Sequence, residues 1–258
     1  MILVIAGTKD GREIAEALEQ EGYPILISVT SEYGRQRLTE RLQQCVNDTA
    51  LDADGLLELI RTRGIRLVID ASHPYALAVS ANSREAAATA NISYLRYERP
   101  PIELPVYDKL HRVDNYEDAA RLAAALGQTI FLTTGSRHLA AFMASPDVKE
   151  RRVVARVLPE ATVLAECSRI GLQPHDIVAL SGPFSKELNM ALFCEYEADV
   201  IVTKNSGEIG GSDTKIAAAM ALELPIVILE RPQQDGNYLE TAADVLVEVK
   251  KEAEKWIS

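Results

Sequence analysis

Short apolar runs alternate with longer amphipathic stretches in the first half of the chain. The apolar runs are rich in Ile, Val and Leu, and they lie at residues 2–6, 25–29, 67–69 and 94–96. Near-continuous apolar runs of this kind are typical of strands buried on both faces. The stretches between them, such as residues 10–20 and 54–63, repeat their apolar positions with the period of a helix. Alternating strands and helices predict a parallel sheet with helices on both faces.

A second α/β series follows a proline-rich junction. Residues 99–105 contain three prolines, which remove backbone donors and prevent a helix from continuing. Apolar runs then return at residues 130–134, 153–157, 177–180, 200–203 and 226–229, and a last apolar run lies at 245–249. Helical patterns lie at residues 116–126, 185–196 and 214–222. We therefore predict an α/β protein of two Rossmann-like domains with mainly parallel sheets, residues 1–110 and residues 111–258.

The composition narrows the class of protein. A chain of 258 residues can bury a sizeable core without disulfide bonds, and its three cysteines lie far apart with no CxxC pair. Core thiols in a reducing cytoplasm fit this pattern. The chain begins with a strand-like run and no basic leader, and no apolar run approaches the roughly 20 residues of a membrane helix. We expect a cytoplasmic protein with no membrane partner.

The charges also limit the partners. A formal net charge of -11 argues against binding to nucleic acid through bulk charge, but it leaves room for a local basic pocket. The four histidines are scattered along the chain, so no metal site of the protein's own is predicted. The oligomeric state stays open at this point.

One loop combines more candidate ligand-binding residues than any other. It follows the apolar run at residues 200–203, and its candidates are Lys204, Asn205, Ser206, Gly207 and Lys215. Glycines let the backbone approach a ligand, N–H groups at a helix start point outward, and ammonium groups supply positive charge. The pattern predicts anion binding. An ordinary loop between strand and helix, with no ligand, is the alternative.

Two further loops of the second half lie at the same edge of the predicted sheet. Residues 133–138 and residues 180–186 each follow a strand, and the carboxyl ends of parallel strands meet at one edge. The cations expected there are Arg137, Arg156, Lys186, Lys204 and Lys215. A local basic pocket on an acidic protein suits a polycarboxylate or a phosphate.

The first strand enters the first helix through a short polar loop. Gly7 permits a tight turn, Thr8 or Asp10 can cap the helix, and the helix start, which includes Lys9, favours a phosphate. The loop does not match the G-x-G-x-x-G motif of dinucleotide sites. A simple cap and turn without a ligand is the alternative reading.

The loops after the second and third strands lie where a Rossmann-like site binds the rest of a dinucleotide. Ser31 and Arg35 suit a ribose 2′-phosphate and favour NADPH, whereas Glu32 suits a 2′-hydroxyl, so NADH stays open. In the later loop Ser72, His73 and Pro74 lie where a nicotinamide or its ribose would be. A lone histidine beside a proline is more often a hydrogen-bonding residue, so we expect His73 to position a ligand.

Taken in order, these motifs resemble the precorrin-6A reductase family of cobalamin biosynthesis, including its cobalt-precorrin-6A branch. The resemblance covers essentially the whole chain. It rests on Gly7-Thr8, residues 64–76, 95–100, 131–135, 182–185 and 203–207, Lys215, and Arg231-Pro232.

The resemblance implies an NADPH-dependent oxidoreductase that adds a hydride and a proton across a carbon–carbon double bond of the macrocycle precorrin-6A. Its substrate is an anionic tetrapyrrole with many acetate and propionate carboxylates, and its active site would lie in the cleft between the domains. The first domain would hold the cofactor through Gly7, Thr8, Lys9, Asp10, Arg35 and the Ser72-His73-Pro74 loop. The second would bind the macrocycle through Lys204, Asn205, Ser206 and Gly207.

For the reaction itself, we expect Lys204 to act electrostatically by polarising the macrocycle. The proton donor stays open among His73, Tyr75 and bound water. Glu208 departs from the family pattern, in which glycine is frequent, and it places a negative charge beside an acidic substrate. Two functions of other classes remain alternatives, a non-redox nucleotide-binding sensor and a transferase acting on a phosphorylated substrate.

Overall fold

The chain forms two compact units. The computed structural model describes residues 1–29, 32–36, 38–207, 210–232 and 237–256. Unit 1 consists of Met1–Pro100 and Gln233–Ser258, and unit 2 consists of Pro101–Pro232. The change of unit falls within the proline-rich stretch, but unit 1 also takes the last segment of the chain. This division differs from the second domain of residues 111–258 that we predicted.

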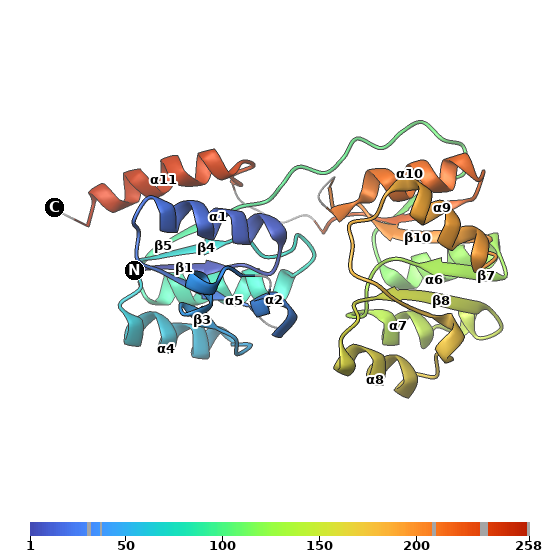
Figure 1. Cartoon of the computed structure of the whole chain (residues 1–258), viewed down its shortest axis with the longest axis horizontal. Helices are drawn as coiled ribbons and strands as arrows, with labels where there is room; N and C mark the ends of the chain where they lie inside the picture. The colour runs from blue at the N-terminus through green and yellow to red at the C-terminus, as the bar shows by residue number, and fades with distance from the viewer. Residues whose placement is uncertain (30–31, 37, 208–209, 233–236, 257–258) are drawn as a thin grey trace. The chain divides into compact units, whose positions relative to one another are not determined.

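Unit 1 is built on a five-stranded parallel sheet (Figure 1). Its strands are β1 (Ile2–Ile5), β2 (Ile25–Ser28), β3 (Val46–Asn47), β4 (Leu67–Asp70) and β5 (Ser93–Arg96). They lie in the order β3-β2-β1-β4-β5. Its helices before the junction are α1 (Lys9–Gln20), α2 (Glu32–Gln36), α3 (Glu40–Gln43), α4 (Ala53–Arg63) and α5 (Leu77–Thr89).

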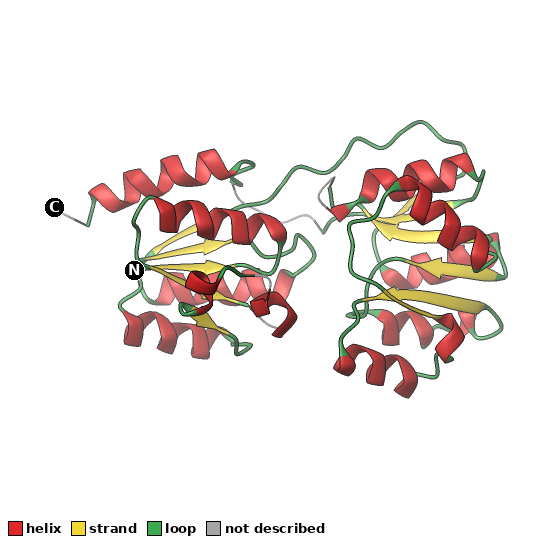
Figure 2. Cartoon of the chain, in the orientation of Figure 1, coloured by secondary structure: helices red, strands yellow, loops and turns green. Residues whose placement is uncertain are grey.

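Helices cover both faces of this sheet (Figure 2). On one face, Ile2 and Val4 of β1 pack in a core with Ile14 of α1. On the other face, Leu3 of β1 packs in a core with Ile60 of α4 and with residues of α5. Burial on both sides explains why the strands read as continuous apolar runs.

The last apolar run belongs to a helix and not to the strand series of the second half. Helix α11 (Ala242–Glu254) begins at the cap residue Thr241, whose hydroxyl accepts from the Asp244 backbone N–H at 3.1 Å. Val245 and Val249 are four residues apart, so they lie on one side of the helix. Both are fully buried in the core that contains Ile14, and α11 lies alongside α1 (Figure 1). A run of valines suggests a strand, but the four-residue spacing of the two buried valines is that of a helix. Their burial in this core makes α11 part of unit 1.

Unit 2 holds a six-stranded parallel sheet in the order β6-β11-β10-β7-β8-β9. The strands are β6 (Leu110–Val113), β7 (Thr129–Leu132), β8 (Arg152–Val157), β9 (Ile177–Ala179), β10 (Val200–Lys204) and β11 (Ile226–Leu229). The helices are α6 (Tyr116–Leu126), α7 (Leu139–Met143), α8 (Ala161–Arg169), α9 (Lys186–Glu195) and α10 (Ser212–Ala221). Strand β6 was not predicted, because this edge strand has His111 and Arg112 side by side at its centre and so lacks a continuous apolar run. The two parallel sheets confirm the predicted α/β class of two Rossmann-like domains.

In each sheet the strand order reverses at one place. In unit 1, β2 and β3 extend to one side of β1, while β4 and β5 extend to the other. In unit 2, β8 and β9 extend beyond β7, while β11 lies beyond β10 on the opposite side. Ligands of such sheets bind at the carboxyl ends of the strands where the order reverses. The loops that follow β1 and β4, and those that follow β7 and β10, therefore form the two candidate sites.

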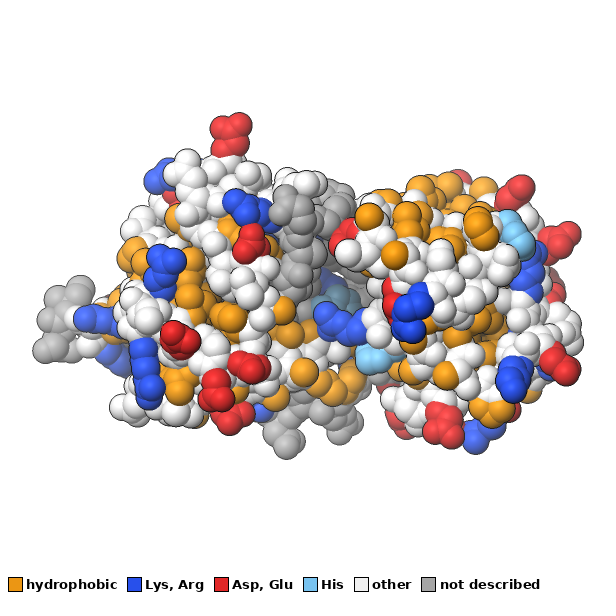
Figure 3. All heavy atoms as spheres, turned by 90° about the horizontal axis from the view of Figure 1, so that it is seen from below, with side chains coloured by type: hydrophobic (Ala, Val, Ile, Leu, Met, Phe, Trp, Pro, Cys, Tyr) orange, Lys and Arg blue, Asp and Glu red, His pale blue; other side chains and the backbone are white. Residues whose placement is uncertain are grey.

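One face of the molecule can be followed in a space-filling view. On the face seen in Figure 3, acidic and basic side chains are interspersed among polar and apolar ones. Within the described ranges, no helix is both long and apolar enough to cross a membrane.

Candidate functional site

In unit 1, Thr8 joins the two loops at the reversal of strand order. Its hydroxyl caps α1 by accepting from the Gly11 backbone N–H at 3.1 Å, and it donates to the carbonyl of Ala71 at 3.2 Å. Ala71 follows β4, so one buried side chain ties the loop after β1 to the loop after β4. Of the two predicted cap residues, Thr8 is the one that caps the helix.

Two glycines shape the start of α1 in different ways. A Cβ atom at Gly11 would lie 2.9 Å from the Cα of Ala6, so Gly11 lets the helix approach β1 closely. A Cβ atom at Gly7 would meet nothing within 4 Å, so packing does not require glycine there. Open space over Gly7 beside a capped helix start fits a dinucleotide pyrophosphate held by backbone N–H groups.

The two charged residues at this helix start behave differently. Asp10 is 3% exposed and forms an ion pair with Arg99, so its carboxylate is already engaged within unit 1. Lys9 is exposed and lies 3.3 Å from Glu13 in a surface pair. Since exposed pairs of this kind contribute little, Lys9 can turn to a phosphate at small cost.

A buried ion pair supports the loop that contains Ser72. Arg96 donates through Nη1 to Asp70 Oδ1 at 2.9 Å and to the Ser72 hydroxyl and carbonyl, each at 3.1 Å. Its Nη2 lies 3.1 Å from Glu98. Burial opposes ionisation of Asp70, but the Arg96 guanidinium and hydrogen bonds from nearby hydroxyls outweigh it and hold the pKa of Asp70 below its usual range. The Ser72 loop therefore rests on a rigid charged network.

His73 and Pro74 follow in the same loop. His73 is half-buried, and its Nδ1 accepts from the Tyr75 backbone N–H at 3.3 Å. The ring centroids of His73 and Tyr75 are 5.5 Å apart. A histidine whose Nδ1 is engaged by the backbone has a defined ring orientation, which suits a residue that positions a ligand.

The residues expected at the adenosine ribose are partly described. Arg35 lies on α2, and its Nη1 is 2.8 Å from Asp48 with its side chain 43% exposed. This pair is exposed enough for a phosphate to compete for the guanidinium. Ser31 lies outside the described residues.

In unit 2, Asn205, Ser206 and Lys215 of the segment after β10 make hydrogen bonds to the protein itself. The Asn205 side chain accepts from the Ile102 N–H at 3.2 Å and donates to the Ile102 carbonyl at 3.1 Å. The Ser206 N–H donates to the Ser212 hydroxyl at 2.9 Å, and Lys215 Nζ donates to the Gly210 carbonyl at 3.1 Å. These contacts fix the shape of the loop in which Gly207 adopts a left-handed conformation, with φ 81°.

Lys204, the last residue of β10, lies in a cluster of aromatic and basic side chains. Its Nζ is 5.8 Å from the ring centroid of Tyr116, at the start of α6, and this ring lies 4.6 Å from that of His138. Burial, and then the charge of Arg137, lowers the pKa of Lys204 to about 8. Burial together with Lys204 and Arg137 also lowers the pKa of His138. The loops after β7 and β10 thus concentrate positive charge where strand order reverses.

Two hydroxyl groups of this cluster, Tyr116 Oη and Thr134 Oγ1, are buried, and the Thr134 hydroxyl lies close enough to act on that of Tyr116. Neither makes a hydrogen bond of ordinary geometry within the described part of the chain. Burial raises the pKa of the Tyr116 hydroxyl to about 12, so it stays a proton donor. Unsatisfied buried hydroxyls are uncommon in folded proteins, and a bound ligand would satisfy them.

The remaining predicted cations of unit 2 lie near β8 and α9. Arg156 is 9% exposed, donates to the Asn189 side-chain oxygen at 2.7 Å, and lies with its guanidinium carbon 4.7 Å from the Phe184 ring centroid. Burial lowers the pKa of Arg156 to about 10. Lys186 is the first residue of α9 and is partly exposed, whereas Arg137 is exposed.

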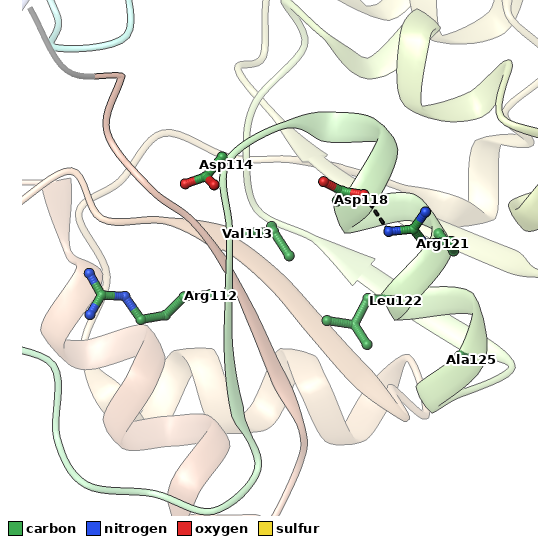
Figure 4. A pocket seen from close by; sticks show the side chains of 7 residues that line it. All are labelled: Arg112, Val113, Asp114, Asp118, Arg121, Leu122 and Ala125. Atoms are coloured by element: carbon green, nitrogen blue, oxygen red, sulfur yellow. Dashed lines mark hydrogen bonds and ion pairs between the residues drawn. The ribbon is translucent and has the colours of Figure 1, made fainter.

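A shallow hollow of about 420 Å³ lies elsewhere in unit 2, between β6 and α6 (Figure 4). Asp118 and Arg121 pair within it, and Arg112, which also lines it, pairs with Glu230. Because both of its arginines already pair with carboxylates, the hollow is a poor site for an anion. Among the described residues, no group of three or more His, Cys, Asp or Glu side chains could hold a metal ion.

Sequence reasoning missed the aromatic part of the Lys204 cluster and the buried ion pair of unit 1. Tyr116 carries no motif, and His138 was predicted only as the last residue of the loop at 133–138, so neither was expected beside Lys204. Asp70 and Arg96 lie directly opposite each other in the register of β4 and β5. Opposite charges at the ends of two neighbouring apolar runs were the available signal for that pair.

Comparison with known proteins gives a consistent family. The family model described as "Precorrin-6x reductase CbiJ/CobK" matches residues 1–251. A cobalt-precorrin-6A reductase of Priestia megaterium is 37% identical, over 95% of this chain and 96% of the relative. A precorrin-6A reductase of Rhodococcus erythropolis is 34% identical, over 90% of this chain and 89% of the relative. A solved structure of "CobK precorrin-6A reductase" matches with a TM-score of 0.78 and 25% identity, covering 97% of this chain and 96% of that one.

Proposed function

The chain belongs to the precorrin-6x reductase CbiJ/CobK family, and we propose that it reduces cobalt-precorrin-6A with NADPH as the hydride donor. It is an oxidoreductase of cobalamin biosynthesis that acts on a carbon–carbon double bond of a tetrapyrrole macrocycle, with a nicotinamide cofactor. The cobalt-containing form of the substrate is proposed because relatives from Priestia megaterium and Salmonella typhimurium carry that name.

The cofactor is assigned to unit 1. The start of α1, with open space over Gly7, would hold the pyrophosphate, and the loop braced by Arg96 would place Ser72 and His73 at the nicotinamide end. Arg35 would exchange its exposed contact with Asp48 for the 2′-phosphate, which favours NADPH over NADH. The bound nicotinamide supplies the hydride.

The macrocycle is assigned to the basic cluster of unit 2, and Lys204 is the observation that carries this assignment. A largely buried ammonium group whose charged neighbour is Arg137 attracts anions strongly, because little water screens it. The substrate brings several carboxylates, and the unsatisfied hydroxyls of Tyr116 and Thr134 offer further donors. Asn205, Ser206 and Lys215 shape the loop that surrounds these groups.

Lys204 also suits the proton transfer that must accompany the hydride. With a pKa of about 8, Nζ carries its proton at neutral pH, yet it releases that proton far more readily than an ordinary lysine. We therefore assign two roles to Lys204: its charge polarises the macrocycle, and its Nζ donates the proton that accompanies the hydride. His73, with its Nδ1 engaged by the backbone, is assigned to positioning the cofactor.

The variant Lys204→Ala tests these assignments. We expect it to bind NADPH with the affinity of the parent protein and to lose at least 100-fold in turnover of cobalt-precorrin-6A, of the order that general acid catalysis contributes. Arg35→Ala is the matched test of unit 1, and it should raise the KM for NADPH but leave the KM for NADH unchanged. Unchanged turnover in Lys204→Ala would remove Lys204 from the mechanism.

A further inference from the structure

Arg156 is a buried guanidinium without a carboxylate partner in the described part of the chain. Three arginines are buried there, and the other two are paired: Arg96 with Asp70 and Glu98, and Arg99 with Asp10. Arg156 instead donates to a neutral amide oxygen of Asn189. A charge removed from water without a counterion costs free energy that the fold normally offsets with a partner.

The guanidinium is held rigidly by neutral groups on two sides. Asn189 is fully buried, and its Nδ2 donates to the Ser185 carbonyl at 2.8 Å, which fixes its oxygen toward Arg156 at 2.7 Å. The ring of Phe184 covers the guanidinium at 4.7 Å. A Cβ atom at Gly182 would lie 3.0 Å from that ring, so the glycine makes room for it. These contacts position the fork and leave its charge uncompensated.

Its place in the sheet matches the candidate site of unit 2. Arg156 is the second-last residue of β8, near the carboxyl edge at which β10 ends with Lys204. Strand β7 lies between β8 and β10, so the two backbones are about 10 Å apart, two strand spacings. Leu132 of β7 pairs with both Ala155 and Val202, so Arg156 and Lys204 are one residue out of step and their side chains leave opposite faces of the sheet. A macrocycle that lies across the carboxyl edge carries acetate and propionate arms around its rim, so it can present one carboxylate to each of these two cations.

We propose that Arg156, clamped by Phe184 and Asn189, binds one peripheral carboxylate of the tetrapyrrole and so sets the orientation of the macrocycle relative to Lys204. A planar guanidinium presents parallel N–H donors that match the two oxygens of a carboxylate, which fixes direction as well as position. The proposal rests on the function proposed above. It makes Arg156 a binding and specificity residue, with no part in the transfer of hydride or proton.

The test compares Arg156→Gln with Arg152→Gln by absorbance titration with cobalt-precorrin-6A in the absence of NADPH. Arg152 lies on the same face of the same strand, at its other end, and pairs with Asp176 at 2.8 Å. We expect the dissociation constant to rise about 10- to 100-fold in Arg156→Gln, as for loss of a hydrogen-bonded charge, and to stay unchanged in Arg152→Gln. At saturating macrocycle, kcat should fall as well, because the macrocycle is no longer oriented relative to Lys204, whereas the KM for NADPH should not change.

Singly methyl-esterified macrocycles identify the carboxylate. The parent protein should bind one monoester about as weakly as Arg156→Gln binds the intact substrate, and Arg156→Gln should not distinguish that ester from the substrate. Phe184→Leu, which keeps the guanidinium, should weaken binding by a smaller factor and provides the test should Arg156→Gln fail to fold. Binding of the macrocycle by Arg156→Gln with the parent affinity, or equal discrimination of every ester by both proteins, would overturn the proposal. Failure of the parent protein to reduce the macrocycle would instead overturn the proposed function.

Discussion

Lys204 holds an ammonium group in a place that costs the fold stability, and replacing it with methionine should show this. Its pKa falls from the ordinary 10.5 to about 8, mainly because the side chain is buried. At 1.36 kcal/mol per pKa unit, the charged form costs the folded state about 3 kcal/mol at neutral pH. Methionine fills a similar volume without the charge. We therefore expect Lys204→Met to raise the free energy of unfolding by up to about 3 kcal/mol while abolishing turnover.

The pH dependence gives this prediction a direction. Because the folded pKa lies below the unfolded one, the folded chain binds this proton less tightly than the unfolded chain does. The cost is complete below about pH 8 and is relieved as the pH rises from 8 toward 10.5. Urea unfolding at pH 7 and at pH 10 should therefore show a difference between Lys204→Met and the parent that shrinks at the higher pH.

A surface lysine provides the control for the same substitution. Lys149 is exposed in unit 2, and Lys149→Met should change the stability by less than about 0.5 kcal/mol at either pH. Loss of stability in Lys204→Met, alongside the loss of turnover, would show that the lysine supports the fold. The reasoning from burial would then be refuted.

Three further variants test other parts of the two sites. Tyr116→Phe removes a buried hydroxyl that makes no hydrogen bond of ordinary geometry in the described chain, so stability should stay within about 1 kcal/mol while macrocycle affinity falls about 3- to 10-fold by titration. Asp70→Asn breaks the buried pair with Arg96 and should lower the free energy of unfolding in urea by about 3–5 kcal/mol. In the parent protein, the stability that this ion pair contributes is lost only as the pH falls through the lowered pKa of Asp70, below its ordinary 3.8. Gly11→Ala drives a methyl group against Ala6, and it should destabilise the protein by about 1–3 kcal/mol. It should also weaken binding of the nicotinamide cofactor in a fluorescence titration. Unchanged cofactor binding would show that the start of α1 does not bind the cofactor.

The architecture could be predicted from the sequence because buried parallel strands leave a strong pattern. The run at residues 226–229 and the helical pattern at 116–126 match β11 and α6 to the residue. Edge strands leave a weaker pattern, which is why β6 escaped notice. The run at 245–249 shows a different limit, since a cluster of valines resembles a strand until the spacing of its buried positions is considered.

The candidate sites could be predicted only as far as loops reveal them. The position of a residue after a strand indicated Gly7, Ser72 and Lys204, but it could not indicate which side chains hold a distant segment in place, as Asn205 holds Ile102. Contacts between segments far apart in sequence, such as Tyr116 with Lys204, depend on the order of strands in the sheet. That order is set by packing and has no local signal.

The most direct test of the account is an anaerobic incubation of the protein with NADPH and cobalt-precorrin-6A, in which nicotinamide absorbance and product mass are followed together. The account predicts a loss of NADPH absorbance in step with a product that is heavier by two hydrogens, and no such product with Lys204→Ala. Absence of reduction with both the cobalt-containing and the cobalt-free macrocycle, while NADPH still binds, would contradict it.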